Sequence, residues 1–490
     1  MQLESLSAIE LGRRIAAGEL TSVAVTEYFL ERSKALNPKI NALVSFEDRA
    51  LELASQADAR LAELGPRSAL DGVPIAIKDI LCMAGTRTTC GSRMLSDYIA
   101  PYTATAVERL LAAGLIPLGK TNMDEFAMGG STETSIYGPT RNPWDPARTA
   151  GGSSGGSAAC LAAGMAPLAI GTDTGGSVRQ PSAYCGVVGL KPTYGRISRF
   201  GLIAFASSFD QIGPMAHHVE DVAALLQILA GPDPRDSTCL PDPADDYRGG
   251  LTGALQGLRV GLVREQVDHP DVAPEVRQAV LRAAAELQRQ GAVVTDAHLS
   301  LSKYAVPTYY VVATSEASGN LSRYDGVHYG FRDLPTDSEQ SPLVALMCRT
   351  RSRGFGAEVK RRIMLGTFAL SAGYYDAYYK KALKVRRLIR DQYLQALEQV
   401  DVLLGPVAPT PAFPLQQNQD DPVRMYLQDQ FTVGANLAGI PSMAVPAGST
   451  ADGLPLAVQI QGPPLSESRL LNVAYQLEQA RFFVPRIAQA

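Results

Sequence analysis

Apolar and polar residues alternate along the chain in blocks that are typical of strands followed by helices. Short apolar runs bounded by turn residues indicate buried strands at 73–78, 115–119, 166–171, 257–263 and 292–298. Helical spacing of apolar positions indicates helices between them at about 105–113, 154–164 and 274–290. This order predicts an α/β fold, with a sheet covered by helices on both faces.

The two ends of the chain show different patterns. Residues 1 to about 65 show helical periodicity, with Thr21 and Ser22 as capping residues, and we expect this segment to wrap the core. Long helices are predicted at about 306–324, 355–369 and 373–399. Strands at 401–405, 442–446 and 455–460 and a helix near 466–480 complete the predicted sheet. A length of 490 residues permits up to three domains.

Composition narrows the class of protein. The chain is 46% apolar and 19% charged, as globular proteins are, and its net charge of −4 gives no broad footprint for nucleic acid. The six cysteines show no metal-binding spacing, so we expect reduced thiols in a cytoplasmic protein. The N-terminus lacks the apolar segment of a signal peptide. The chain has no run of about 18 apolar residues, so no membrane span is predicted.

Two glycine-flanked serine clusters, at 151–157 and 175–177, lie on either side of an apolar run. Glycine lets the main chain approach a reacting group, and consecutive N–H groups in such a turn can bind a developing oxyanion. We therefore interpret Ser177 as a nucleophile on a tight turn. The N–H groups of Thr174, Gly175 and Gly176, with that of Ser177, are the candidate oxyanion hole.

A serine nucleophile needs a base, and none of the five histidines lies in a glycine-rich or turn-rich segment. Lys78 is a better candidate, because it ends the predicted strand at 73–78, where α/β sheets usually place functional groups. A lysine acts as a base only when neutral, and apolar surroundings lower its pKa. Cys185 is close to Ser177 in sequence, but without a histidine partner we assign it to core packing.

Together, Lys78, the GGSSGG segment and Thr174-Gly175-Gly176-Ser177 resemble the amidase signature family. The intervals of 75 residues from Lys78 to Ser153 and 24 from Ser153 to Ser177 fit that resemblance. It implies a mixed central β-sheet and a Ser-cisSer-Lys triad, with Ser177 as nucleophile, Ser153 as a bridging serine after a cis peptide bond, and Lys78 as base and later acid. It also implies one large domain over 66–490, with a helical insertion at about 300–400, after the N-terminal helical segment.

The segment from Gly114 to Thr121 matches the phosphate-loop pattern GxxxxGK[ST], but the predicted elements around it are not those of a phosphate loop. A phosphate loop follows a strand and begins a helix, whereas this segment follows a helix and is itself an apolar strand. We therefore expect no nucleotide site there, although nucleotide binding remains an alternative hypothesis of a different class.

Within the amidase signature family, GKTNMDEFAMGGSTE at 119–133, GLKPTYGR at 189–196 and RRIMLGT at 361–367 are similar to the A subunits of the amidotransferases acting on Glu-tRNA(Gln) or Asp-tRNA(Asn). This resemblance implies a glutaminase that works with B and C subunits and supplies ammonia to the partner subunit that converts Glu-tRNA(Gln) to Gln-tRNA(Gln), Asp-tRNA(Asn) to Asn-tRNA(Asn), or both. Glutamine would be its small-molecule substrate, and tRNA would bind mainly to a partner. The chain itself would hold no cofactor or metal, because ATP and Mg²⁺ would be used by the partner. The alternative is a stand-alone amidase with the same triad.

Glutamine presents a carboxylate and an ammonium beside its amide, so a selective site needs a cation and an anion. By resemblance these are Arg362 and Asp429. The further substrate-binding candidates implied are Met128, Gly129, Tyr309 and Tyr310.

Overall fold

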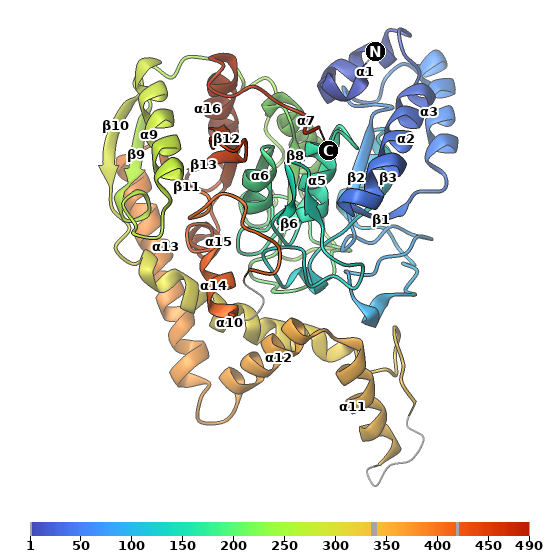
Figure 1. Ribbon diagram of the computed structural model, residues 1–490, viewed down its shortest axis with the longest axis vertical. Coiled ribbons are helices and arrows are strands. Elements are labelled where there is room, and N and C mark those ends of the chain that lie inside the picture. Colours follow the sequence, from blue (N-terminus) through green and yellow to red (C-terminus); the bar gives the residue numbers. More distant parts are fainter. Residues whose placement is uncertain (1, 335–340, 418–420, 490) are drawn as a thin grey trace.

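The computed structural model describes residues 2–334, 341–417 and 421–489. An eleven-stranded sheet crosses the molecule in the order β1-β3-β2-β6-β8-β7-β12-β13-β11-β9-β10 (Figure 1). Its strands are β1 (Leu43–Phe46), β2 (Pro74–Lys78), β3 (Ile116–Thr121), β6 (Leu168–Asp173), β7 (Val188–Lys191), β8 (Gln211–Ala216), β9 (Arg259–Val263), β10 (Val293–Ala297), β11 (Val402–Pro406), β12 (Ser442–Ser449) and β13 (Pro455–Gln461). A separate ribbon pairs β4 (Arg141–Asn142) with β5 (Asp145–Thr149).

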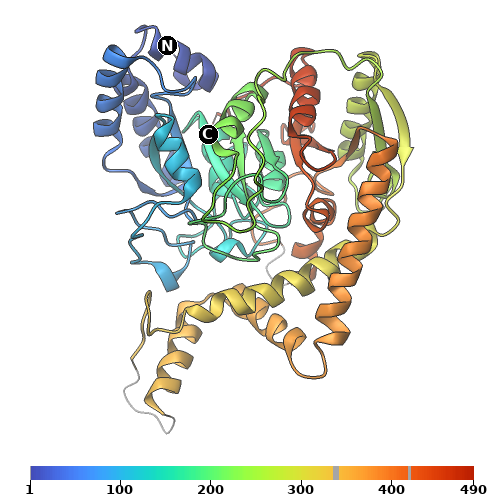
Figure 2. The same ribbon diagram turned by 180° about the vertical axis from the view of Figure 1, so that it is seen from behind.

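The sheet is mixed. β2 pairs in parallel with β3 and β6, and β9 pairs in parallel with β10 and β11. The strands between these two groups are antiparallel, as is the edge strand β1. Helices cover both faces (Figures 1 and 2), which confirms the predicted fold class.

The helices that surround the sheet are α1 (Ala8–Ala16), α2 (Ser22–Ile40), α3 (Ala50–Leu64), α4 (Thr105–Ala112), α5 (Gly155–Ala162), α6 (Arg179–Cys185), α7 (Val219–Leu229), α8 (Arg264–Val267), α9 (Pro274–Arg289) and α16 (Glu467–Gln479). Side chains accept from the N–H groups that begin α1 and α2, and for α1 the acceptor comes from α7. Thr21 accepts from the Ala24 N–H at the start of α2, and Asp221 accepts from two N–H groups at the start of α1. Phe29 of α2 is fully buried in the main hydrophobic core.

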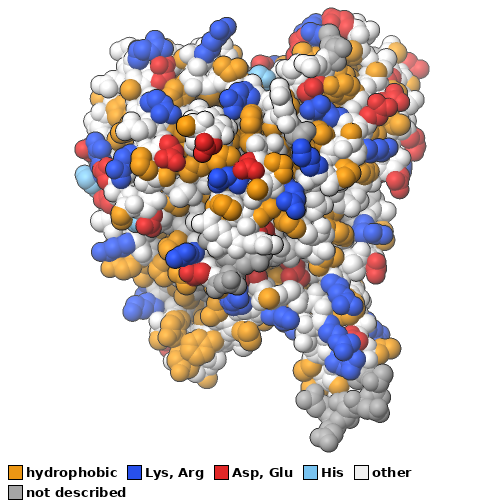
Figure 3. Space-filling view, in the orientation of Figure 1, with side chains coloured by type: hydrophobic (Ala, Val, Ile, Leu, Met, Phe, Trp, Pro, Cys, Tyr) orange, Lys and Arg blue, Asp and Glu red, His pale blue; other side chains and the backbone are white. Residues whose placement is uncertain are grey.

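The helical region after β10 extends beyond the sheet. It comprises α10 (Ala305–Asn320), α11 (Pro342–Gly354), α12 (Ala357–Leu370), the short π-helix Asp376–Lys380 and α13 (Lys381–Gln399). After β11 come α14 (Pro422–Leu427) and α15 (Val433–Ala438). Figures 1 and 2 show α11 and the α12–α13 hairpin projecting from the body. Exposed apolar side chains gather at the tip of that hairpin (Figure 3), among them Phe368 and Tyr378.

Several elements differ from the sequence expectations. The segment up to about residue 65, for which only helices are predicted, also contains β1, a four-residue edge strand paired antiparallel with β3. The sequence patterns do not predict β7 and β8, because each is short and contains glycine, and β8 also contains Pro214. None of the helices in the described ranges combines the length and hydrophobicity needed to cross a membrane.

Candidate active site

Lys78 ends β2 inside the protein, surrounded by hydroxyl groups. Its side chain is fully buried, and its Nζ lies 2.8 Å from each of three acceptors, the side-chain oxygens of Ser153, Ser154 and Thr172. Burial disfavours the ammonium form and lowers the pKa of Lys78 to about 7. A substantial fraction of Lys78 is therefore neutral near neutral pH, as a general base requires.

Ser153 lies at the sharp entry to α5. The Gly152–Ser153 peptide bond is cis, as the family resemblance implies. The Ser154 N–H donates to the Ser177 carbonyl at 3.2 Å, which joins the two serine turns directly. Ser153 is fully buried, whereas Ser177 retains 7% exposure. Of the three predicted catalytic side chains, Ser177 is thus the one that a substrate reaches first.

The Ser177 turn follows β6 and is held by Asp173, the last residue of that strand. Asp173 Oδ1 accepts from the Gly176 N–H at 2.9 Å, and its carboxylate pairs with Arg179, which is also fully buried. Burial alone would raise the pKa of Asp173, but Arg179 outweighs it and the pKa falls to about 2. Asp173 is therefore ionised at physiological pH and fixes the turn.

The predicted oxyanion donors divide into two groups in this structure. The Gly176 N–H is directed at Asp173 and is not available to a substrate. The N–H groups of Thr174, Gly175 and Ser177 meet no acceptor in the described part of the chain. The geometry therefore offers the N–H groups around Gly175 and Ser177, rather than that of Gly176, to a developing negative charge.

Close packing around the turn explains its glycines. Gly176 has φ of +143°, and a Cβ at this position would lie 2.3 Å from the Thr432 hydroxyl. A Cβ at Gly175 would lie 2.7 Å from the Tyr309 ring. Thr432 Oγ1 donates to the Gly175 carbonyl at 2.6 Å, and Thr174 Oγ1 donates to Asp210 at 2.7 Å. Side chains from distant segments thus hold the turn from both sides.

A cavity of about 250 Å³ lies between the main body and α12. Gly129 and Gly130 line one wall, Glu358 and Arg361 a second, and Tyr426 a third. Met128 is fully buried in the main core, so its side chain does not line the cavity. Of these two predicted substrate-binding residues, Gly129 thus lines the cavity and Met128 does not.

Arg362 is buried on the inner face of α12, with 3% exposure. Its Nε donates to Glu358 at 2.8 Å, and the same carboxylate oxygen accepts from the Tyr426 hydroxyl at 2.8 Å. Its guanidinium lies 5.2 Å from the Tyr310 ring centre and 5.3 Å from that of Tyr426. The Nη groups of Arg362 meet no hydrogen-bond acceptor among the described residues, so they are the part of the fork open to a ligand.

Asp429 follows α14 and lies against the Ser177 turn. A Cβ at Gly176 would lie 3.3 Å from its Oδ1, and a Cβ at Gly130 would lie 4.0 Å from its Oδ2. Oδ1 is buried and without a hydrogen-bond partner in the described residues. Burial raises the pKa of Asp429 to about 8, while the charge of Arg362 acts in the opposite direction. An unpartnered buried carboxyl beside the turn is suited to a cationic group on a ligand.

The two tyrosines named from the sequence have different positions. Tyr309 is buried and packs against Gly175. Tyr310 stacks on Tyr426, with ring centres 3.9 Å apart. Both therefore lie at the site, Tyr309 at the turn and Tyr310 beside Arg362.

The structure also locates the histidines, Cys185 and Lys120, which the sequence analysis did not assign to the site. Each histidine makes its contacts elsewhere: His217 with the Leu161 carbonyl, and the other four with nearby carboxylates. Cys185 is a fully buried free thiol whose pKa is raised by burial. Lys120, of the phosphate-loop pattern, is buried in β3 and donates to the Leu81 carbonyl at 2.6 Å. It therefore faces the interior rather than an anion-binding loop.

Sequence reasoning missed several residues of the site. Ser154 and Thr172 both contact Lys78, and the GGSSGG segment could have indicated Ser154. Glu358 precedes Arg362 by four residues, which is the spacing of helical ion pairs and could have identified it. Asp210 and Thr432 are far from Ser177 in sequence, and no local pattern indicates them.

Comparison with known proteins agrees with this geometry. The family model described as Amidase matches residues 24–471. The chain is 52% identical over 488 residues to the A subunit of the Glutamyl-tRNA(Gln) amidotransferase of Rhodopirellula baltica, covering 98% of this chain and 97% of that protein. It is 53% identical to the protein of the same name from Azotobacter vinelandii over 479 residues, with 98% of both covered.

Solved structures extend the likeness to the whole fold. The A subunit of the Glutamyl-tRNA(Gln) amidotransferase of Thermotoga maritima superposes with a TM-score of 0.82 at 39% identity, covering 100% of this chain and 99% of that one. The peptide amidase of Stenotrophomonas maltophilia superposes with a TM-score of 0.84 at 32% identity, with the same coverage. The chain therefore belongs to the amidase signature family.

Proposed function

We propose that this chain is the glutaminase subunit of a tRNA-dependent amidotransferase. The observation that carries the proposal is the contact between Lys78 and Ser153, because a buried lysine of lowered pKa meets a serine hydroxyl directly beside the Ser177 turn. The names of the full-length relatives support the same role, since they are A subunits of such enzymes.

In the proposed reaction, Ser177 Oγ attacks the side-chain amide carbon of glutamine. Its proton passes to Ser153, whose own hydroxyl proton passes to neutral Lys78. The N–H groups around Gly175 and Ser177 stabilise the negative oxygen. Lys78 then returns its proton through Ser153 to the departing nitrogen, which leaves as ammonia. Water attacks the resulting ester, so that one glutamine and one water give glutamate and ammonia.

Substrate choice would follow from the charges of Arg362 and Asp429. The free Nη groups of Arg362 suit the α-carboxylate of glutamine, and the unpartnered Oδ1 of Asp429 suits its α-ammonium. Because Asp429 lies against Gly176, an ammonium bound there would place the amide near Ser177. Ammonia would then go to a partner that holds the tRNA and uses ATP and Mg²⁺, yielding Gln-tRNA(Gln), Asn-tRNA(Asn) or both.

The test follows the amide nitrogen. Glutamine labelled with ¹⁵N in its side chain is incubated with this chain, the B and C subunits from the same genome, ATP, Mg²⁺ and Glu-tRNA(Gln) or Asp-tRNA(Asn). We expect label in the aminoacyl group with the wild-type chain and none with Ser177→Ala. The isolated chain is expected to hydrolyse glutamine slowly and to be activated in the complex, as in sites completed by induced fit.

The alternative is a stand-alone amidase, which the likeness to a peptide amidase along the whole chain favours. Full amide hydrolysis by the isolated chain, with no transfer of label to tRNA, would establish that function instead.

A further inference from the structure

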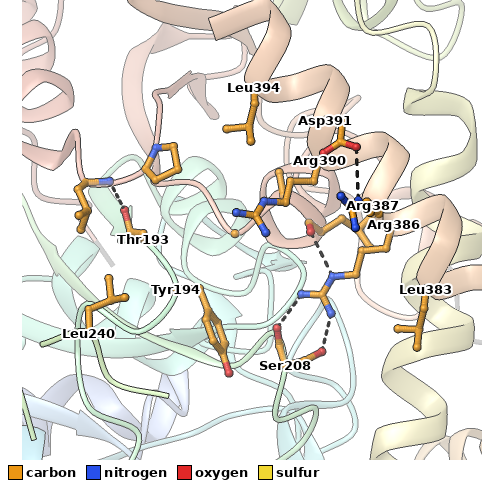
Figure 4. A pocket seen from close by; sticks show the side chains of 15 residues that line it. Thr193, Tyr194, Ser208, Leu240, Leu383, Arg386, Arg387, Arg390, Asp391 and Leu394 are labelled. Carbon is orange, nitrogen blue, oxygen red and sulfur yellow. Dashed lines mark hydrogen bonds and ion pairs between the residues drawn. The ribbon is translucent and has the colours of Figure 1, made fainter. Parts of the chain in front are cut away.

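A second pocket, of about 790 Å³, lies at the C-terminal end of α15, whereas the Ser177 turn contacts Thr432 directly before that helix. Figure 4 shows its walls, with α13 carrying Arg386, Arg387 and Arg390, and the segment at Thr193 and Tyr194 lying opposite. Residues 437–439 at the end of α15 form part of the lining. No part of the proposed reaction uses this pocket.

The charged side chains that line this pocket are mostly positive. Its lining contains three arginines and one carboxylate, that of Asp391. Asp391 Oδ2 lies 3.8 Å from Arg387 Nε. Arg390 is exposed and makes no hydrogen bond or ion pair among the described residues. The chain as a whole carries a net charge of −4, so this positive region is a local exception. Such a region attracts an anionic ligand.

The walls between the arginines are apolar. Leu240, Leu394, Leu437, Pro464 and Leu465 contribute to the lining. A free inorganic anion would leave these surfaces wet, whereas an acidic polypeptide with apolar side chains would cover both the charges and the apolar wall. A volume of about 790 Å³ accommodates several side chains.

Arg386 connects the pocket to the two supports of the Ser177 turn. It is anchored by donating to the Ser208 hydroxyl at 2.7 Å and to the Ser208 carbonyl at 2.9 Å. It also donates to the Leu437 carbonyl at 3.2 Å, at the end of α15 (Figure 4). Its guanidinium lies 4.1 Å from the Phe209 ring centre.

The residues that Arg386 contacts are adjacent in sequence to residues that bind the Ser177 turn. Phe209 precedes Asp210, which accepts from the Thr174 hydroxyl. Thr432, directly before α15, donates to the Gly175 carbonyl, and Asn436 within α15 donates to Asp173 at 2.8 Å. These contacts therefore link Arg386 to both sides of the Ser177 turn.

We propose that this arginine pocket is the docking site for an acidic, partly apolar segment of a partner protein, and that docking acts on the Ser177 turn through Arg386. The proposal rests on the proposed function for the identity of the partner, which is another subunit of the amidotransferase. Charge complementarity selects the occupant, and the paired contacts of Arg386 supply the connection.

The docking step is tested with Arg387→Glu/Arg390→Glu, using the purified B and C subunits from the same genome as the probe. We expect the affinity for these subunits to fall by about tenfold or more, and its dependence on salt to weaken. The matched control is Lys381→Glu/Lys384→Glu, which makes the same charge change on exposed positions of α13 outside the pocket. It should alter affinity by less than about twofold, as expected for exposed charges.

Several outcomes would overturn the docking proposal. They are unchanged affinity in the pocket variant, an equal loss in the control, or loss of tRNA binding with the subunits still bound. A wild-type chain that binds neither subunit would overturn the proposed function itself, and the docking proposal with it. The two failures are therefore distinguishable.

The connection to the turn is tested with Arg386→Gln and Arg386→Lys. A serine-reactive fluorophosphonate reports the reactivity of Ser177 with and without the partner subunits. We expect both variants to bind the subunits but to lose most of the partner-dependent increase in labelling, measured in each variant as the ratio of labelling with and without the subunits. Arg386→Lys keeps the charge but not the forked contacts, so it guards against a folding defect in Arg386→Gln. A full partner-dependent increase in Arg386→Lys would overturn this step.

Discussion

Lys78 Nζ lies 2.8 Å from Ser153 Oγ, and both side chains are fully buried. A proton can therefore move between them without passing through solvent. Lys78 Nζ lies at the same distance from Ser154 Oγ, and the Ser154 N–H donates to the Ser177 carbonyl, so Ser154 connects the lysine to the turn that carries the proposed nucleophile.

The first prediction concerns the nucleophile. Ser177→Ala should abolish formation of an acyl-enzyme, because the other hydroxyl of the turn, that of Thr174, is bonded to Asp210. Lys78→Ala and Ser153→Ala should each slow acylation by about 10²–10⁴-fold, the usual contribution of acid-base catalysis. Mass spectrometry of the enzyme trapped with a reactive glutamine analogue locates the adduct. An adduct on Cys185 or on any residue other than Ser177 would refute the assignment.

The second prediction concerns pH. Burial lowers the pKa of Lys78 from 10.5 to about 7, and only the neutral form accepts a proton. Acylation should therefore be slow in acid and should rise with pH through about 7. The rate constant for fluorophosphonate labelling, measured from pH 5 to 9, gives the apparent pKa. Lys78→Arg, which stays charged, is the control and should be slow at every pH; a wild-type profile flat across this range would contradict the prediction.

The sequence sufficed for those parts of the fold where one pattern dominates locally. β2 and β3 are predicted from their own apolar runs, and α9 from its own helical spacing of apolar residues. None of these patterns depends on a contact with another element. β1 is different, because only Leu43 in it is buried and its pairing with β3 is set by tertiary contacts. β8 carries Gly213 and Pro214 in a buried position, a composition that is unusual in a strand.

The candidate site likewise has a part that the sequence predicts and a part that it does not. Ser177 and its glycines form a local turn, so their arrangement was accessible from sequence. The supports from Asp210 and Thr432 join segments that only folding brings together. The direction of the Gly176 N–H was not accessible either, since Asp173 competes for it as an acceptor.

The third prediction concerns the geometry of Arg362. Glu358 accepts from Arg362 Nε and from the Tyr426 hydroxyl, so it fixes the guanidinium with its Nη groups free. Arg362→Lys and Asp429→Asn should each raise the KM for glutamine by about 10–100-fold, because each removes one charge-assisted contact worth about 1.5–3 kcal/mol.

Glu358→Gln separates positioning from direct binding. Its amide oxygen can still accept from Arg362, so the KM should rise by less than about tenfold and kcat should change little. Glu358→Ala should have the larger effect on KM. An unchanged KM in both Arg362→Lys and Asp429→Asn would show that glutamine binds elsewhere.

The fourth prediction concerns thiol reactivity. Cys348 is exposed, whereas Cys90, Cys160 and Cys185 are fully buried and have pKa values raised by burial. Iodoacetamide should therefore modify Cys348 first in the folded chain and leave the buried three intact. Peptide mapping after timed alkylation measures the order. Glutaminase activity should survive modification of Cys348, and its early loss together with modification of Cys185 would reopen a thiol mechanism.

The last prediction concerns Lys120. This lysine is buried, donates to the Leu81 carbonyl and the Thr88 hydroxyl, and lies 4.0 Å from the carboxylate of Asp79. Lys120→Met should leave ATP use by the assembled complex intact, because no phosphate contacts this side chain in the proposed function. It should instead destabilise the fold by about 3 kcal/mol, since it leaves the buried Asp79 without its cation.

Denaturant unfolding of Lys120→Met and Lys120→Met/Asp79→Asn separates the two explanations. The double variant carries no carboxylate at position 79, and it should recover part of the lost free energy of unfolding if charge is the cause. Burial raises the pKa of Asp79 to about 6 although the charge of Lys120 lowers it, so in Lys120→Met the carboxyl should titrate above 6, and the stability lost should shrink as pH falls towards 6 and the carboxyl is protonated. Loss of ATP use by a stably folded Lys120→Met complex would instead restore the nucleotide-binding hypothesis for the segment from Gly114 to Thr121.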